Sequence, residues 1–158
     1  MTMLGVRDHN TDGLGFLDLA EAVDRITAHP EPELRELYRR VIFDVAVSNQ
    51  DDHLRNHGFL LEGEGWRLSP AYDINPVHNA DFLSMNLDEN DAYRSFEKVL
   101  ETAPFYHIEK DEALEMIHRI SSVVSDSWEE RAAKCGIKQS ERKFMSSAFS
   151  LTEEGRKL

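Results

Sequence analysis

The chain is poor in cysteine, in long apolar runs and in basic residues. Cys135 is the single cysteine among 158 residues, which excludes an internal disulfide and a zinc site built from cysteines. No segment approaches the roughly 20 apolar residues that a membrane-spanning helix requires. The N-terminus, residues 1–7, also lacks the apolar core of a signal peptide. These absences predict a protein of the reducing cytoplasm with no membrane partner.

Acidic residues dominate the charge balance. The chain carries 18 Lys and Arg against 30 Asp and Glu, a net charge of -12. Because contacts with phosphate backbones require clustered Lys and Arg, we expect no direct contact with nucleic acid. Hydrophobic residues make up 41% of the chain, which is typical of a globular protein. The length predicts a single domain over residues 1–158.

Apolar periodicity predicts a mainly helical chain. The clearest stripe runs through residues 34–45 with helical spacing and predicts a helix that ends near Ser48, after a break at residues 29–32. Other helices are expected over residues 17–28, 92–103, 109–133 and 140–149, the first with Asp18 and the last with Ser140 as N-cap. We expect residues 1–15 to form an irregular lead-in and residues 150–158 a tail.

A small β-hairpin follows the central helix. Residues 58–61 and 66–68 are expected to form two short strands, with residues 62–65 as the turn between them. Residues 82–87 form a further candidate strand. The predicted fold class is therefore α+β, mainly α-helical, with one hairpin.

Polar side chains gather on both sides of this hairpin. Residues 49–57 form a loop of carboxylates, amides and imidazoles directly after the central helix. Asn56 lies just before the first strand and Asp73 just after the second. Since a hairpin returns the chain to the end where it started, Asn56 and Asp73 should finish near each other. Asp51 precedes Asn56 by five residues and is expected on the same side.

These side chains suit phosphoryl transfer. An Asn amide oxygen and an Asp carboxylate are ligands that Mg²⁺ accepts, and a further Asp can take a proton from a hydroxyl nucleophile. Protein kinases divide the work in this way, with an Asp base, an Asn five residues later and a second metal-binding Asp beyond. Asp51, Asn56 and Asp73 follow that spacing.

The pattern resembles the C-terminal catalytic lobe of HipA-like serine/threonine kinases, whose motif is matched by Asn49-x-Asp51-x-His53-x-x-Asn56 and, after the hairpin, by Ala71-Tyr72-Asp73. The resemblance covers most of residues 17–150. It implies Asp51 as the catalytic base and Asn56 and Asp73 as Mg²⁺ ligands. It also implies that His53 and Tyr72 lie close to bound ATP and that the fold is a protein-kinase-like C-lobe with its hairpin beside the catalytic loop.

The resemblance also implies partners. HipA-like kinases act as toxins that phosphorylate a protein target and are restrained by a DNA-binding antitoxin. No Gly-rich phosphate loop and no strand lysine precede the catalytic loop in this sequence. We therefore expect the nucleotide-binding N-lobe to come from another chain or a longer gene product, and we expect a protein substrate and an antitoxin-type regulator.

Other interpretations of the same residues stay open. The chain could be a catalytically inactive kinase-derived module that binds proteins, with self-association through the face that an N-lobe would cover. It could also be a metal-dependent phosphoesterase or nuclease, although two-metal hydrolysis usually needs more carboxylates. Asp51, Asn56 and Asp73 could each be ordinary turn or capping residues.

Overall fold

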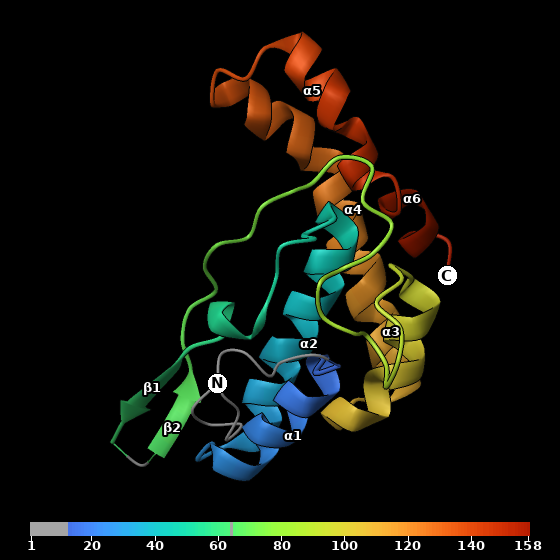
Figure 1. Ribbon diagram of the computed structural model, residues 1–158. Coiled ribbons are helices and arrows are strands. Elements are labelled where there is room, and N and C mark those ends of the chain that lie inside the picture. Colours follow the sequence, from blue (N-terminus) through green and yellow to red (C-terminus); the bar gives the residue numbers. More distant parts are fainter. Residues whose placement is uncertain (1–12, 64) are drawn as a thin grey trace.

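The structure, a computed structural model, describes residues 13–63 and 65–158 (Figure 1). Most of the predicted lead-in, residues 1–12, lies outside the described residues. The elements are α1 (Phe16–Ile26), α2 (Pro30–Val47), η2 (Leu54–Asn56), β1 (Phe59–Glu62), β2 (Gly65–Leu68), α3 (Phe96–Thr102), η3 (Ala103–Tyr106), α4 (Lys110–Lys134), α5 (Gln139–Met145), η4 (Ser146–Phe149) and α6 (Thr152–Gly155). The predicted α+β class, mainly helical with one small hairpin, is confirmed.

The central helix α2 lies between α1 and α4 and forms the middle of the core (Figure 1). The predicted break before it is shorter than expected, because Pro30 is the first helical residue. Proline is well suited there, since its fixed φ is helical and the missing N–H would have no partner in the first turn. The helix ends as predicted, with Ser48 in the left-handed conformation at φ 58°.

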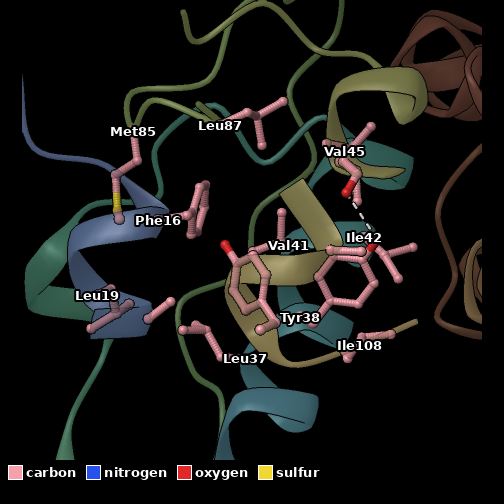
Figure 2. Close-up of a cluster of buried hydrophobic side chains, with 14 of the residues drawn as sticks. Phe16, Leu19, Leu37, Tyr38, Val41, Ile42, Val45, Met85, Leu87 and Ile108 are labelled. Atoms are coloured by element: carbon pink, nitrogen blue, oxygen red, sulfur yellow. Dashed lines mark hydrogen bonds between the residues drawn. The ribbon is translucent and has the colours of Figure 1, made fainter. Parts of the chain in front are cut away.

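The core is built on the apolar face of α2. Leu37, Tyr38, Val41 and Ile42 are at most 1% exposed and pack with Phe16 of α1 (Figure 2). Full burial of side chains of this size contributes about 1.5–3 kcal/mol each. The buried hydroxyl of Tyr38 donates a hydrogen bond to the Val99 carbonyl at 2.9 Å, which ties α2 to α3. Burial raises the pKa of Tyr38 well above its ordinary value.

The predicted hairpin is confirmed. Strands β1 and β2 pair antiparallel, with Phe59 opposite Leu68 and Leu61 opposite Trp66. The Ala28 N–H donates to the Trp66 carbonyl at 3.1 Å, and the Leu68 N–H donates to Glu33 at 2.8 Å. These bonds fix the hairpin against the junction between α1 and α2.

Two predicted elements differ from the structure in the middle of the chain. Residues 82–87 form only isolated bridges, Phe82 with Tyr93 and Asn86 with Gly15, instead of a strand. Helix α3 begins at Phe96 rather than at residue 92, because Ser95 is its N-cap and accepts a hydrogen bond from the Lys98 N–H at 3.3 Å. The helix therefore begins four residues after the start of the predicted segment.

The predicted stop of α4 agrees with the structure, whereas the predicted N-caps of α1 and α5 do not. Gly15, not Asp18, is the N-cap of α1, and Asp18 accepts from the Gly15 N–H at 2.8 Å from within the first turn. Helix α4 ends at Lys134, one residue after the predicted end. Gly136 follows with φ 81°, and its N–H donates a hydrogen bond to the Ala133 carbonyl. Ser140 lies inside α5, whose N-cap is Lys138.

The segment predicted as a tail contains α6, which packs against α4. Thr152 is 2% exposed and Gly155 is buried. The hairpin and α5 lie at opposite ends of the molecule (Figure 1). Among the described residues, no helix is long and apolar enough to cross a membrane.

Candidate active site

The loop after α2 separates its two neighbouring aspartates. Asp51 is exposed, whereas Asp52 is 3% exposed. Asp52 Oδ2 lies 2.9 Å from His57 Nε2 in a pair whose side chains are each 4% exposed. An edge-to-face contact with Phe16, with 6.0 Å between ring centroids, holds the His57 ring from the other side. Of the two aspartates, only Asp51 is therefore open to an external substrate.

A buried polar cluster lies beneath this loop. Asn49 donates through Nδ2 to Asp44 Oδ1 at 2.9 Å, and both residues are at most 2% exposed. Burial and the neighbouring Asp52 carboxylate raise the pKa of Asp44 well above its usual range, against the opposing effects of Asn49 and Arg40. Arg40 is itself buried and donates to the Ser69 carbonyl at 2.7 Å. The loop and the end of β2 are thus anchored on α2.

A hydrogen bond joins the segments that carry Asn56 and Asp73. Asn56 is 6% exposed and ends the 3₁₀ turn η2. The Tyr72 hydroxyl donates to the Arg55 carbonyl at 2.6 Å, which joins the segment before Asp73 to the residue before Asn56. The hairpin between them pairs antiparallel and, as predicted, returns the chain to the end where it started.

The Asp73 carboxylate is held from one side only. Asp73 is exposed and adopts a left-handed backbone at φ 58°. Asn75 Nδ2 donates to its Oδ1 at 2.9 Å. Aspartate tolerates this backbone conformation better than most residues, since its short polar side chain can bond locally. Oδ2 makes no hydrogen bond with the described part of the chain.

The other predicted site residues differ in their exposure and in their hydrogen bonds. His53 is half-buried, and its Nδ1 is a buried atom with no hydrogen-bond partner among the described residues. Tyr72 is 47% exposed, and its hydroxyl bonds to the Arg55 carbonyl. Within the described ranges, no hydrogen bond links Asp51 to Asn56 or Asp73.

The donor atoms are suited to Mg²⁺. Within residues 13–63 and 65–158, no three His, Cys, Asp or Glu side chains form a metal-binding group. The expected ligands are instead one amide, on Asn56, and one carboxylate, on Asp73. Mg²⁺ is commonly held by one or two carboxylates together with substrate phosphates and water, so a sparse, all-oxygen donor set of this kind fits it.

The sequence motif included Asn49 but did not predict the hydrogen bonds that support the loop, nor the part that Asp44 and Asn75 play in them. Asp44, Asn49 and Asn75 form hydrogen bonds that connect α2, the loop and the segment after Asp73. One signal was present in the sequence: Asp44 is the single acid in the apolar run over residues 41–47. A lone acid in such a run is rarely buried without a partner.

The fold is shared with a HipA protein of known structure. The HipA chain from the Shewanella oneidensis MR-1 toxin–antitoxin complex of HipA, HipB and operator DNA matches with a TM-score of 0.71 at 15% sequence identity. The match covers 98% of this chain and 39% of that chain. The predicted kinase-like C-lobe is thereby confirmed as a fold.

Sequence comparison points in the same direction. The chain is 32% identical over 62 residues to the protein named "Putative kinase Y4mE" from Sinorhizobium fredii (strain NBRC 101917 / NGR234). The matched stretch covers 39% of this chain and 15% of that protein. The chain thus spans well under half the length of the relatives it matches. The family model described as HipA-like C-terminal domain matches residues 1–128. The chain belongs to this family of HipA-like C-terminal domains.

Proposed function

We propose that the chain is the catalytic lobe of a HipA-like serine/threonine protein kinase and that a nucleotide-binding lobe outside these 158 residues completes the ATP site. The reaction is transfer of the γ-phosphoryl group of ATP to a protein hydroxyl. One observation carries the proposal: the Tyr72–Arg55 hydrogen bond joins the segments of Asn56 and Asp73, while Asp51 stays exposed on the same loop.

Asp51 is proposed as the general base. It would accept the proton from a Ser or Thr hydroxyl as the oxygen attacks the γ-phosphorus. Its exposure supports this role, because the hydroxyl belongs to another protein and must reach the carboxylate. Asp52 is a poor alternative, since it is buried and paired with His57.

Asn56 and Asp73 are proposed as Mg²⁺ ligands. Bound by these two side chains, Mg²⁺ would supply positive charge against the negative charge that develops during transfer. The role of the chain is to hold the amide and carboxylate oxygens at fixed positions. The hydrogen bonds from Asn75 to Asp73 and from Tyr72 to Arg55 support that rigidity.

His53 and Tyr72 are proposed as contacts with bound ATP. Nδ1 of His53 is buried and has no hydrogen-bond partner among the described residues, which supports this role because such a nitrogen is costly unless a ligand supplies the bond. For Tyr72, an aromatic side chain that is 47% exposed, this exposure supports a stacking or packing contact.

The expected partners follow from the relatives. The HipA protein with this fold was solved with HipB and operator DNA, which supports an antitoxin-type regulator for this chain. A protein hydroxyl is the proposed substrate. We also propose a cytoplasmic setting, which the exposed free thiol of Cys135 supports.

The test is transfer of label from γ-labelled ATP in the presence of Mg²⁺. The chain is assayed alone and mixed with a separately purified nucleotide-binding lobe of a HipA-like kinase, as wild type and as Asp51→Asn. We expect transfer only in the mixture, reduced about 10²–10⁴-fold by Asp51→Asn, the usual contribution of a general base.

Two results would argue against the proposal. Equal transfer by wild type and Asp51→Asn would assign the base to another residue. The absence of transfer in every mixture would favour the protein-binding module, and light scattering would then test self-association through the uncovered face.

A further inference from the structure

Three hydrogen bonds form a relay from the interior of α2 to the Asp73 carboxylate. Asn49 Nδ2 donates to Asp44 Oδ1 at 2.9 Å, and the Asn75 backbone N–H donates to Asn49 Oδ1 at 3.0 Å. The Asn75 side chain then donates through Nδ2 to Asp73 Oδ1 at 2.9 Å. The relay therefore connects a buried point of the core with the exposed carboxylate.

Asn49 is the central member of this relay. It is 1% exposed, and its amide group donates at one end and accepts at the other. An ionised Asp of the same shape accepts only, and a Ser hydroxyl does not span both partners. The contacts on its two sides also fix which end of the amide carries oxygen.

The two asparagines of the relay belong to the segments that carry the proposed chemistry. Asn49 lies two residues before Asp51, and Asn75 lies two residues after Asp73. A backbone hydrogen bond joins the same two segments: the Val77 N–H donates to the Ser48 carbonyl at 3.0 Å. The segment after Asp73 is thus aligned with the start of the loop through both side chains and backbone.

We propose that Asn49 and Asn75 are positioning residues for the divalent-cation site. Asn49 holds the segment of Asp73 in register with Asp51, and Asn75 occupies Oδ1 of Asp73, which leaves Oδ2 for the cation. The inference rests on the proposed function. Neither asparagine touches the cation, so each acts through Asp73. Loss of a hydrogen-bonding partner of this kind weakens metal affinity about 10–100-fold.

The test uses Mn²⁺ as the probe and the ¹⁵N-labelled chain. Backbone amide signals broadened by added Mn²⁺ locate the cation and give its apparent Kd. The variants are Asn75→Ala, Asn49→Ala and the control Asn90→Ala, whose side chain is exposed and which contributes only its backbone N–H to a bond with Asp88. Hydrogen exchange of the Asn75 amide reports on the relay without metal.

We expect Mn²⁺ to broaden signals around Asn56 and Asp73 in the wild type. Asn75→Ala should weaken this binding at least about tenfold with an unchanged Tm, since the residue is exposed. Asn49→Ala should weaken it similarly and remove the exchange protection of the Asn75 amide. Asn90→Ala should change neither quantity.

Different failures have different meanings. Wild-type Mn²⁺ affinity in Asn75→Ala, or an unprotected Asn75 amide in the wild type, would overturn the inference and leave the proposed function standing. No localised broadening in the wild type would overturn the proposed metal ligands and the inference together. If Asn49→Ala unfolds, Asn75→Ala alone decides the outcome.

Discussion

The Tyr72 hydroxyl donates a hydrogen bond to the Arg55 carbonyl at 2.6 Å, and this contact spans the base of the hairpin. The two residues precede Asp73 and Asn56, the proposed Mg²⁺ ligands. Gly58 lies directly beside the contact, because a Cβ at that position would be 3.5 Å from the Tyr72 hydroxyl and 2.9 Å from Ser69 Oγ. The hairpin base is therefore closely packed around the bond that joins the segments of the two proposed ligands.

Replacing Tyr72 with Phe should remove this bond and little else. We expect a loss of about 0.5–1.5 kcal/mol in the free energy of unfolding, the usual net value of one hydrogen bond, measured by urea denaturation. Tyr93→Phe is the matched control, since Tyr93 is similarly exposed at 48% and its hydroxyl bonds to none of the described residues. An equal loss in both variants would show that the bond to Arg55 has no specific effect.

The Asp52–His57 pair should contribute more than any surface pair. His57→Leu leaves a buried carboxylate without its partner at 2.9 Å, so we expect a cost of about 3–5 kcal/mol in unfolding free energy. His57→Gln should lose less, because an amide nitrogen can donate to Asp52. The control is His118→Leu on the exposed surface of α4, expected within about 0.5 kcal/mol of wild type. A small effect of His57→Leu would contradict the structural role assigned to the pair.

Asp44 should make stability fall as pH rises. Its pKa is raised in the folded state by burial and by Asp52, so the folded protein holds this proton to a higher pH than the unfolded chain. The stabilising contribution is complete below the ordinary pKa of 3.8 and is lost as pH rises through the higher folded pKa. Asp44→Asn resembles the protonated acid and should escape this loss.

We therefore expect Asp44→Asn to gain stability over the wild type as pH increases, by on the order of 1–3 kcal/mol, the range for an incompletely compensated buried polar group. Urea denaturation between pH 4 and 8 measures the difference at each pH. A difference that stays constant over this range would contradict a raised pKa for Asp44.

Gly155→Ala tests the packing of the C-terminal segment. An added Cβ would lie 2.7 Å from the Phe96 ring and also against the Ser121 hydroxyl, so α6 would have to shift. We expect a loss of about 1–3 kcal/mol, measured by thermal or urea unfolding. Glu154→Ala, at the exposed neighbouring position, is the control. If the two variants unfold alike, α6 does not pack as described.

The sequence predicted the elements whose signals are local. The apolar spacing of residues 34–45 gave α2 and its end near Ser48, and the turn residues between two apolar stretches gave the hairpin. The long helix α4 and its stop at Gly136 were predicted for the same reason. Each depends on residues that are neighbours in sequence.

Features that depend on tertiary contacts were not predictable in this way. Residues 82–87 alternate like a strand but have no neighbouring strand to pair with, apart from single bridges. The links from Asp44 to Asn49 and from Asn49 to Asn75 join residues 5 and 26 positions apart, and no spacing rule anticipates the second. The candidate residues came from a motif, whereas their supporting hydrogen bonds required the structure.

The most direct test of the central claim is calorimetric titration of Mg²⁺-ATP into wild type, Asn56→Ala, Asp73→Asn and Asp51→Asn, each mixed with a separately purified nucleotide-binding lobe of a HipA-like kinase and compared with that lobe alone. Asp73→Asn keeps a residue that tolerates the left-handed backbone, so it removes the charge without adding strain. The account predicts binding to the wild type, its loss in Asn56→Ala and Asp73→Asn, and its retention in Asp51→Asn, because a base is not a ligand. Binding that survives in both ligand variants, or no wild-type binding at millimolar Mg²⁺-ATP, would contradict it.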